Sequence, residues 1–254
     1  MQIIDTHAHL TSDELFDQAP MLIKRALDAC VYKIFNINTD SITLKRGLEL
    51  KQHFDCIENI AACTPHDVDQ IGESFFQEVA LAAKEKKLIA IGETGLDYYY
   101  MHSDQDNQKR HFEKYISLAL EHQLPLVIHC RNAFEDLIRI LDRYKEMKKV
   151  IIHCFTGTDD EAIECVSRGY YLSFSGIVTY KKSLALQTTC TGVPIDRLLI
   201  ETDAPYLAPQ NLRGKVNEPA FMVETLQKLA FLHHMTQDKM ANILLANTKR
   251  VFGI

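Results

Sequence analysis

Ile3-Ile4-Asp5-Thr6-His7-Ala8-His9, residues 3–9, begins as an apolar run and ends in polar, titratable side chains. An apolar run without strict alternation of apolar and polar residues is typical of a strand covered on both faces in a parallel sheet. Seven further short runs are predicted as strands, and most of them have the same character. The eight predicted strands span residues 3–5, 33–36, 57–61, 88–92, 126–129, 150–153, 170–174 and 198–201.

Amphipathic stretches of helical period separate these runs and also follow the last one. The predicted helices span residues 17–29, 42–54, 71–86, 105–122, 133–147, 159–168, 181–189, 220–234 and 237–248. Eight strands that alternate with helices predict an α/β fold, the (β/α)8 TIM barrel, as a single domain over residues 1–254. An open doubly wound sheet is the alternative, but no glycine-rich phosphate loop follows the first strand.

The composition is that of an ordinary globular protein, with 46% apolar and 24% charged residues, which excludes a disordered or fibrous chain. No apolar run approaches the roughly 20 residues that would span a bilayer, and no secretory signal precedes Ile3. Seven cysteines without a C-x-x-C pair indicate free thiols in a reducing compartment. We therefore expect a cytoplasmic protein that needs no membrane, and we expect a monomer.

The formal net charge of -6, from 28 basic and 34 acidic residues, argues against a protein that holds nucleic acid through a broad basic face. The same charge is compatible with an enzyme that acts on phosphate esters, because bound divalent cations reverse the sign of the local field.

Six side chains of metal-ligand type follow five of the predicted strands, and in a barrel the carboxyl ends of all strands meet on the face that carries active sites. A single H-x-H pair could equally be two hydrogen-bonded or exposed histidines, but six such residues at one rim predict a metal site. Six ligands are too many for one catalytic ion and suit two ions about 3.5–4 Å apart. Imidazole and carboxylate ligands favour Zn, Mn or Mg. The six residues are His7, His9, Glu93, His129, His153 and Asp203.

The motifs at these strand ends resemble those of the TatD family of metal-dependent deoxyribonucleases, in family order from residue 5 to residue 219. They are DTHAH (5–9), GETGLDY (92–98), HCR (129–131), HCFTG (153–157), ETDAPYLAP (201–209) and RGKVNEP (213–219). The resemblance implies a TIM barrel that needs divalent metal and hydrolyses phosphodiester bonds in DNA. It further implies a 3′–5′ exonuclease that acts on single-stranded ends, with RNA as an alternative substrate.

The resemblance also implies that the same six residues are the metal ligands, with Glu93 as the bridge between two ions. One departure is visible after the third strand, where this chain has Thr64 before Pro65-His66 and family members often have a histidine. The departure bears on rate, substrate preference and any third metal, and leaves the two-ion site intact.

Two acidic residues of the last strand receive catalytic roles beside Glu93. Asp203 is expected to touch one ion and the attacking water, and so to orient that water and act as its general base. This role requires hydrogen-bond reach more than an unusual pKa. Glu201, two residues earlier on the same face, is expected to orient a ligand histidine. The alternative for Glu201 is a buried carboxylate paired with a cation.

Substrate contacts are predicted from the loops at the same rim. Arg131 is placed to grip a phosphate oxygen, and Arg213 and Lys215 could hold a neighbouring phosphate or remain solvated. Asn217 and Glu218 shape that loop. The tyrosines from Tyr98 onward offer a stacking surface for bases or pack on a helix, and the same alternatives hold for His66. Six other histidines are interpreted as structural or solvated, away from the rim: His53, His102, His111, His122, His233 and His234.

Two rival functions remain at this point. A hydrolase on the same scaffold could cleave an amide, a lactone or the ester of an aminoacyl-tRNA, although such barrels commonly bridge their metals with a modified lysine where this chain has Glu93. A noncatalytic, metal-containing binding protein is the second rival, and the candidate base Asp203 argues against it.

Overall fold

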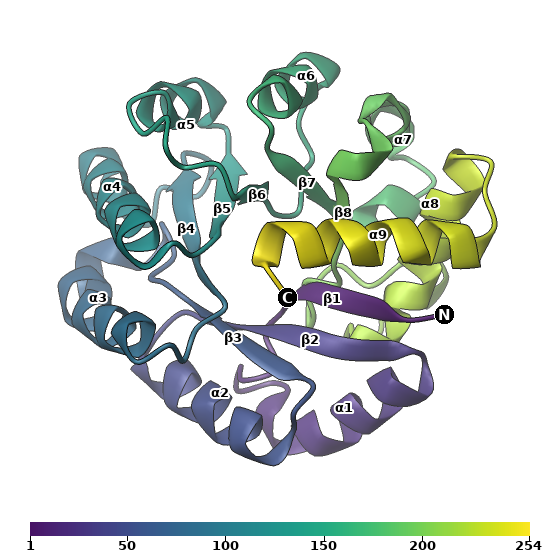
Figure 1. Ribbon diagram of the computed structural model, residues 1–254, viewed down its shortest axis with the longest axis horizontal. Coiled ribbons are helices and arrows are strands. Elements are labelled where there is room, and N and C mark those ends of the chain that lie inside the picture. Colours follow the sequence, from purple (N-terminus) through teal and green to yellow (C-terminus); the bar gives the residue numbers. More distant parts are fainter.

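The computed structural model describes residues 1–254 as one eight-stranded parallel barrel, which confirms the predicted fold and every predicted strand (Figure 1). The strands neighbour one another in chain order. A short parallel bridge between Ala8 and Ala204 brings the last strand beside the first and nearly closes the barrel. The strands are β1 (Ile3–Ala8), β2 (Val31–Asn38), β3 (Ile57–Ala61), β4 (Ala90–Asp97), β5 (Leu126–Arg131), β6 (Val150–Ile152), β7 (Tyr171–Phe174) and β8 (Leu198–Ile200).

A ring of helices surrounds the strands (Figure 1). None of them is both long and apolar enough to cross a bilayer. The α-helices are α1 (Ala19–Asp28), α2 (Ser41–His53), α3 (Val68–Lys84), α4 (Gln105–His122), α5 (Phe134–Leu141), α6 (Asp159–Ser167), α7 (Leu184–Gly192), α8 (Met222–Leu232) and α9 (Gln237–Phe252).

Several helix boundaries differ from the prediction by three or more residues, and three of them have a visible cause. Helix α5 ends before residue 147 because the chain turns at Asp142, whose carboxylate pairs with Arg168 after α6. Helix α7 begins later than residue 181, where the backbone N–H of Lys181 donates to the side chain of Gln210. Helix α9 continues past residue 248 and ends where Gly253 adopts a positive φ of 75°, as is common at helix C-termini.

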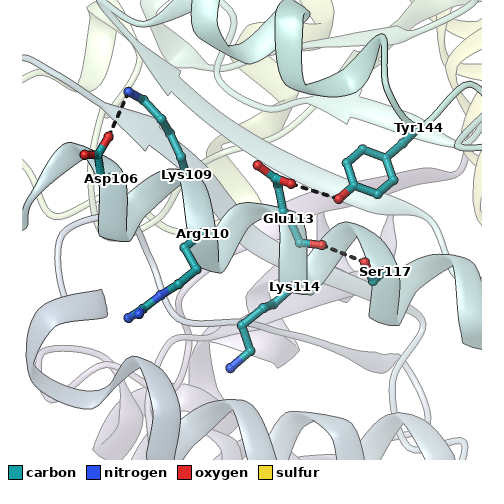
Figure 2. A pocket seen from close by; sticks show the side chains of 7 residues that line it. All are labelled: Asp106, Lys109, Arg110, Glu113, Lys114, Ser117 and Tyr144. Atoms are coloured by element: carbon teal, nitrogen blue, oxygen red, sulfur yellow. Dashed lines mark hydrogen bonds and ion pairs between the residues drawn. The ribbon is translucent and has the colours of Figure 1, made fainter.

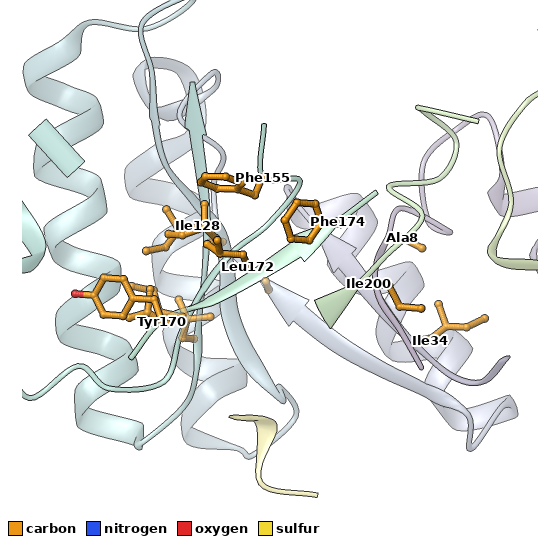
Figure 3. Close-up of a cluster of buried hydrophobic side chains, with 14 of the residues drawn as sticks. Ala8, Ile34, Ile128, Phe155, Tyr170, Leu172, Phe174 and Ile200 are labelled. Carbon is orange, nitrogen blue, oxygen red and sulfur yellow. The ribbon is translucent and has the colours of Figure 1, made fainter. Parts of the chain in front are cut away.

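Two apolar cores lie on opposite faces of the strands. The larger, of 58 buried residues, fills the space between the strands and the helices, and Figure 3 shows Ile128, Leu172 and Phe174 among its members. The smaller, of 11 residues, takes at least one side chain from every strand and therefore fills the barrel interior. All seven cysteines are free, as predicted.

Helix α9 closes the amino end of the barrel. It runs alongside β1, and the C-terminus lies beside this strand (Figure 1). Val251 and Phe252 join the inner core, and the Phe252 ring meets that of Phe35 edge to face at 4.6 Å. The amino end of the barrel interior is therefore apolar, and polar side chains enter the barrel at its carboxyl end.

Candidate metal centre

The side chains of the site follow the inner core residues by two positions on three strands. Val127 and Ile151 belong to the inner core, and His129 and His153 come two residues later, on the same face of their strands. Leu199 precedes Glu201 in the same way. The strands therefore aim these polar side chains into the carboxyl end of the barrel, directly above the apolar layer.

Glu93, buried on β4, lies at the centre of four imidazoles. Its Oε2 atom is 3.4 Å from Nε2 of His7 and 3.8 Å from Nε2 of His9. Its Oε1 atom is 3.0 Å from Nδ1 of His129 and 3.0 Å from Nε2 of His153. Each oxygen of the carboxylate thus faces a different pair of histidines.

Asp203 completes the half of the centre that contains His7 and His9. Its Oδ1 atom is 3.4 Å from Nε2 of His9 and 3.7 Å from Nε2 of His7. The turn that carries Asp203 is held by Asn217, whose side-chain amide donates to the carbonyls of Thr202 and Tyr206 at 2.9 and 2.6 Å. The structure thus brings all six predicted ligands together, and Asn217 lies in the loop that it was expected to shape.

Two further carboxylates contact the outer nitrogens of His129 and His153. Glu201 Oε1 is 3.4 Å from Nδ1 of His153 and accepts the backbone N–H of Cys154 at 2.7 Å. Asp97 Oδ2 is 2.9 Å from Nε2 of His129. Carboxylates in this position fix the ring orientation and tautomer of ligand histidines. Glu201 lies where the sequence placed it.

Asp97 was not singled out by the sequence analysis, although it stands in the same strand-end motif as Glu93. Asp5 was also overlooked. It is buried at the start of the H-x-H segment and accepts hydrogen bonds from the backbone N–H and the hydroxyl of Thr202 at 3.0 and 2.6 Å. Asp5 thereby ties β1 to the chain after β8, beside the centre.

The charges of the centre stabilise one another. Burial alone would raise the pKa of Glu93, but the surrounding imidazoles, led by His153, hold it well below its usual range. The same burial would lower the pKa of His153, but Glu93 and Glu201 raise it well above its usual value. Burial also opposes ionisation of Asp203, and the hydrogen bond with His9 nevertheless lowers its pKa. The lowered pKa values of Glu93 and Asp203 mean that these two carboxylates are ionised at neutral pH and available as ligands.

The side chains present fit a divalent metal. Both ring nitrogens of His7 are buried without a hydrogen-bond partner. Leaving them unpaired costs free energy, and a metal ion bound to the imidazole would remove part of that cost. Ligand atoms lie within 4.8 Å of one another in the sets His7–His9–Glu93 and Glu93–His129–His153. Imidazole nitrogen and carboxylate oxygen are ligands that zinc and manganese accept.

The residues predicted to contact substrate are spread around the rim. The guanidinium of Arg131 stacks over the rings of Tyr99 and Tyr100, at 3.9 and 4.7 Å from their centroids. Arg213 lies 4.4 Å from the ring centroid of Tyr180, and Lys215 is exposed in the same loop. Their phosphate contacts stay predictions.

The structure favours one of the two alternatives for Tyr98 and corrects the placement of His102. Tyr98 is half-buried, packs on the outer core and donates its hydroxyl to Asp136 at 2.7 Å, which favours the packing alternative. His102 was expected away from the rim, which is wrong, because the loop after β4 folds back and places its ring 5.5 Å from that of His66. His66 in turn lies 3.6 Å from Asp97. Thr64, the departure noted above, donates its hydroxyl to Asp67.

A separate surface depression lies on the helical layer and contains none of the predicted residues. It is lined mainly by α4, and Figure 2 shows three of its charged side chains, Asp106, Lys109 and Glu113, in contact with neighbours. Lys109 pairs with Asp106 at 3.3 Å, and Glu113 accepts the Tyr144 hydroxyl at 3.0 Å. Exposed pairs of this kind are typical of a solvated helix face.

Comparison with known proteins yields one family. Residues 4–253 match the family model described as TatD related DNase. A Bacillus subtilis protein named uncharacterized metal-dependent hydrolase YabD is 38% identical, with 99% of each chain covered. The protein named 3′-5′ ssDNA/RNA exonuclease TatD from Citrobacter koseri is 31% identical, also over 99% of each chain. The crystal structure of YjjV, a TatD homologue from Escherichia coli K12, superposes with a TM-score of 0.92 at 25% identity, covering 99% of this chain and 98% of that one.

Proposed function

Because this chain belongs to the TatD family of metal-dependent hydrolases, we propose that it is a nuclease that hydrolyses phosphodiester bonds of single-stranded DNA or RNA from the 3′ end, with two divalent metal ions. The Citrobacter koseri relative is named as a 3′-5′ ssDNA/RNA exonuclease, and this supports the substrate and the direction. The arrangement around Glu93 supports the number of ions.

The two oxygens of Glu93 carry the two-ion proposal. One oxygen faces His7 and His9. The other faces His129 and His153 at equal distances of 3.0 Å. A carboxylate that points its oxygens at two separate pairs of imidazoles suits a bridging ligand, whereas a single ion would leave one pair without a function. We assign Asp203 to the ion on the side of His7 and His9, because its Oδ1 atom faces both of these imidazoles.

The residues of the chain provide the remaining chemistry. When bound, two divalent ions would activate the attacking water and neutralise charge on the phosphate. Asp203, ionised and facing the open end of the barrel, accepts the proton of the attacking water. Glu201 and Asp97 hold the rings of His153 and His129 in the orientation in which their inner nitrogens face Glu93.

Cations at the rim are assigned to the substrate. Arg131, two residues after His129 at the end of β5, offers its planar fork to a phosphate oxygen. Arg213 and Lys215 bind a more distant phosphate of the same strand. Because the chain has a net charge of -6, these few cations together with the ions account for the attraction of a polyanion.

End-labelled single strands test the proposal. Protein treated with a chelator and then given Mg²⁺, Mn²⁺ or Zn²⁺ separately should shorten a 5′-labelled DNA or RNA strand progressively, and Asp203→Asn should abolish this without loss of folding. Charged tRNA is the parallel substrate. Release of the amino acid without cleavage of any phosphodiester would contradict the proposal and favour the deacylase. Binding of the strand without any hydrolysis would favour the binding protein.

A further inference from the structure

We propose that His66, Tyr100 and His102 form a pocket that binds a nucleobase of the substrate strand by stacking, next to the metal centre. The inference rests on the proposed function for the identity of the ligand. It transfers the stacking role from Tyr98, which is packed against the protein, to a set of rings that come together only in the folded chain.

The pocket has a size and a lining that suit an uncharged ring. Its volume is about 290 Å³, and it is lined by His66, Asp67, Gln70, Tyr100 and His102. The Tyr100 and His102 rings lie 5.5 Å apart with an interplanar angle of 30°, and the His66 ring meets both of them edge-on. Three ring systems thus border one small, open pocket. Aromatic faces stack on any base and so suit a nuclease without sequence preference.

The polar groups of the lining favour a base over a phosphate. Asp67 and Gln70 can accept and donate hydrogen bonds at the edges of a base, and neither lysine nor arginine lines the pocket. A phosphate would meet the Asp67 carboxylate without a compensating cation. The guanidinium of Arg131 lies over the Tyr100 ring, at the side of the pocket, where it can reach the sugar-phosphate backbone.

The pocket is held in place before any ligand binds. Asp97 Oδ1 accepts the backbone N–H groups of Tyr99 and Tyr100, both at 2.9 Å, and so fixes the turn that carries Tyr100. Ser103, buried next to His102, donates its hydroxyl to the carbonyl of His66 at 2.6 Å. These bonds join the loop after β3 to the loop after β4.

The same carboxylate couples the pocket to the metal centre. Asp97 Oδ2 is 2.9 Å from His129 and 3.6 Å from His66. The His66 and His129 rings are 5.5 Å apart. A strand with a phosphate at the centre therefore has a neighbouring base within reach of the pocket.

Fluorescence of 2-aminopurine tests the pocket directly. The probe is a short single strand with phosphorothioate linkages that resist hydrolysis and with 2-aminopurine at one position, moved along the strand in a series. Stacking on Tyr100 and His102 should quench the base at one position in the metal-loaded wild type. Tyr100→Ala and His102→Ala should remove that quenching and weaken binding roughly 10-fold, in line with the loss of one base–aromatic stack.

Matched variants separate stacking from general damage. Tyr100→Phe keeps the ring and should quench and bind like the wild type. Phe231→Ala removes an exposed ring from α8, far along the chain from the pocket, and should change neither. Thermal unfolding verifies that each variant is folded. Unchanged quenching and affinity in both Tyr100→Ala and His102→Ala would overturn the pocket.

Cleavage of the unmodified strand reports separately on the proposed function. Hydrolysis together with unaltered quenching in both alanine variants would refute the pocket alone. Quenching that depends on Tyr100, in a protein that cleaves no strand with any metal, would support the pocket and refute the nuclease.

Discussion

The two ends of the barrel interior are built on the same strands from opposite kinds of side chain. At the amino end, Val127 and Ile151 pack in an apolar core that α9 covers with Phe252. Two residues further along the same strands, His129 and His153 surround a buried carboxylate. The barrel supplies the direction of each side chain, and the position along the strand decides whether that side chain packs or binds.

A second comparison concerns two buried histidines. His7 and His111 are each almost fully buried, and both ring nitrogens of each lack a hydrogen-bond partner. His7 has the carboxylates of Glu93 and Asp203 within 3.7 Å, while His111 has only the exposed Glu73, at the same distance. The histidine at the barrel end thus lies among the proposed metal ligands, and the one on α4 fills space against Gly72 of α3.

Glu93→Gln should have the largest effect, because it removes the charge shared by four imidazoles at the polar end. We expect hydrolysis to fall by more than about 100-fold, beyond the effect of losing an outer partner of a ligand histidine. Bound metal, measured by elemental analysis, should fall in parallel. Glu146→Gln, an exposed change, is the control. A Glu93→Gln protein with full metal content and activity would show that Glu93 is not a bridge.

Phe252→Ala should have the next largest effect and should act only at the apolar end. Loss of a buried ring from a core costs about 3 kcal/mol in the free energy of unfolding. Urea denaturation measures the cost, with Ile254→Ala, at an exposed neighbour, as the control. Metal binding by the folded variant should stay unchanged. If metal affinity fell as steeply as stability, the two ends would not be independent.

Glu201→Gln should weaken the centre without removing a ligand. The substitution preserves shape and takes away the carboxylate beside Nδ1 of His153, so we expect hydrolysis or metal affinity to fall about 10- to 100-fold. Titration with Zn²⁺ or Mn²⁺ and the rate at saturating metal distinguish the two effects. Wild-type values for both would mean that Glu201 serves only to bind the Cys154 backbone.

The substitution His111→Gln should have the smallest effect, which is a change in how the free energy of unfolding depends on pH. Burial, with Lys114 and Arg110 nearby, lowers the pKa of His111 below 6.5, while Glu73 and Asp69 oppose the shift. As the pH drops, His111 therefore takes up a proton in the unfolded chain at a higher pH than in the folded chain. The free energy of unfolding consequently falls as the pH drops below about 6.5. Urea denaturation between about pH 7.5 and 5.5 should show a shallower fall for His111→Gln. Equal slopes would contradict this assignment.

Much of the fold and of the ligand set could be predicted because both depend on local pattern. Most of the strands contain a short apolar run, and each proposed ligand stands at or just after the end of such a run, so their convergence follows from the barrel alone. Glu201 could be placed behind the metal ligands because residues two apart share a face of a strand.

The remaining features depend on how distant segments pack. His102 reaches the rim because Ser103 binds the carbonyl of His66, a contact that no periodicity encodes. Helix α9 extends past its amphipathic pattern because Val251 and Phe252 enter the barrel. Asp97 could be seen in its motif, but its contact with His129 requires the register between β4 and β5, which pairs residue 97 with residue 131.

Anomalous diffraction from crystals grown with Mn²⁺ would test the two-ion centre most directly. The account predicts two peaks about 3.5–4 Å apart, both in contact with Glu93. One peak should lie among His7, His9 and Asp203, and the other beside His129 and His153. A single peak, or peaks that leave either histidine pair without metal, would contradict it.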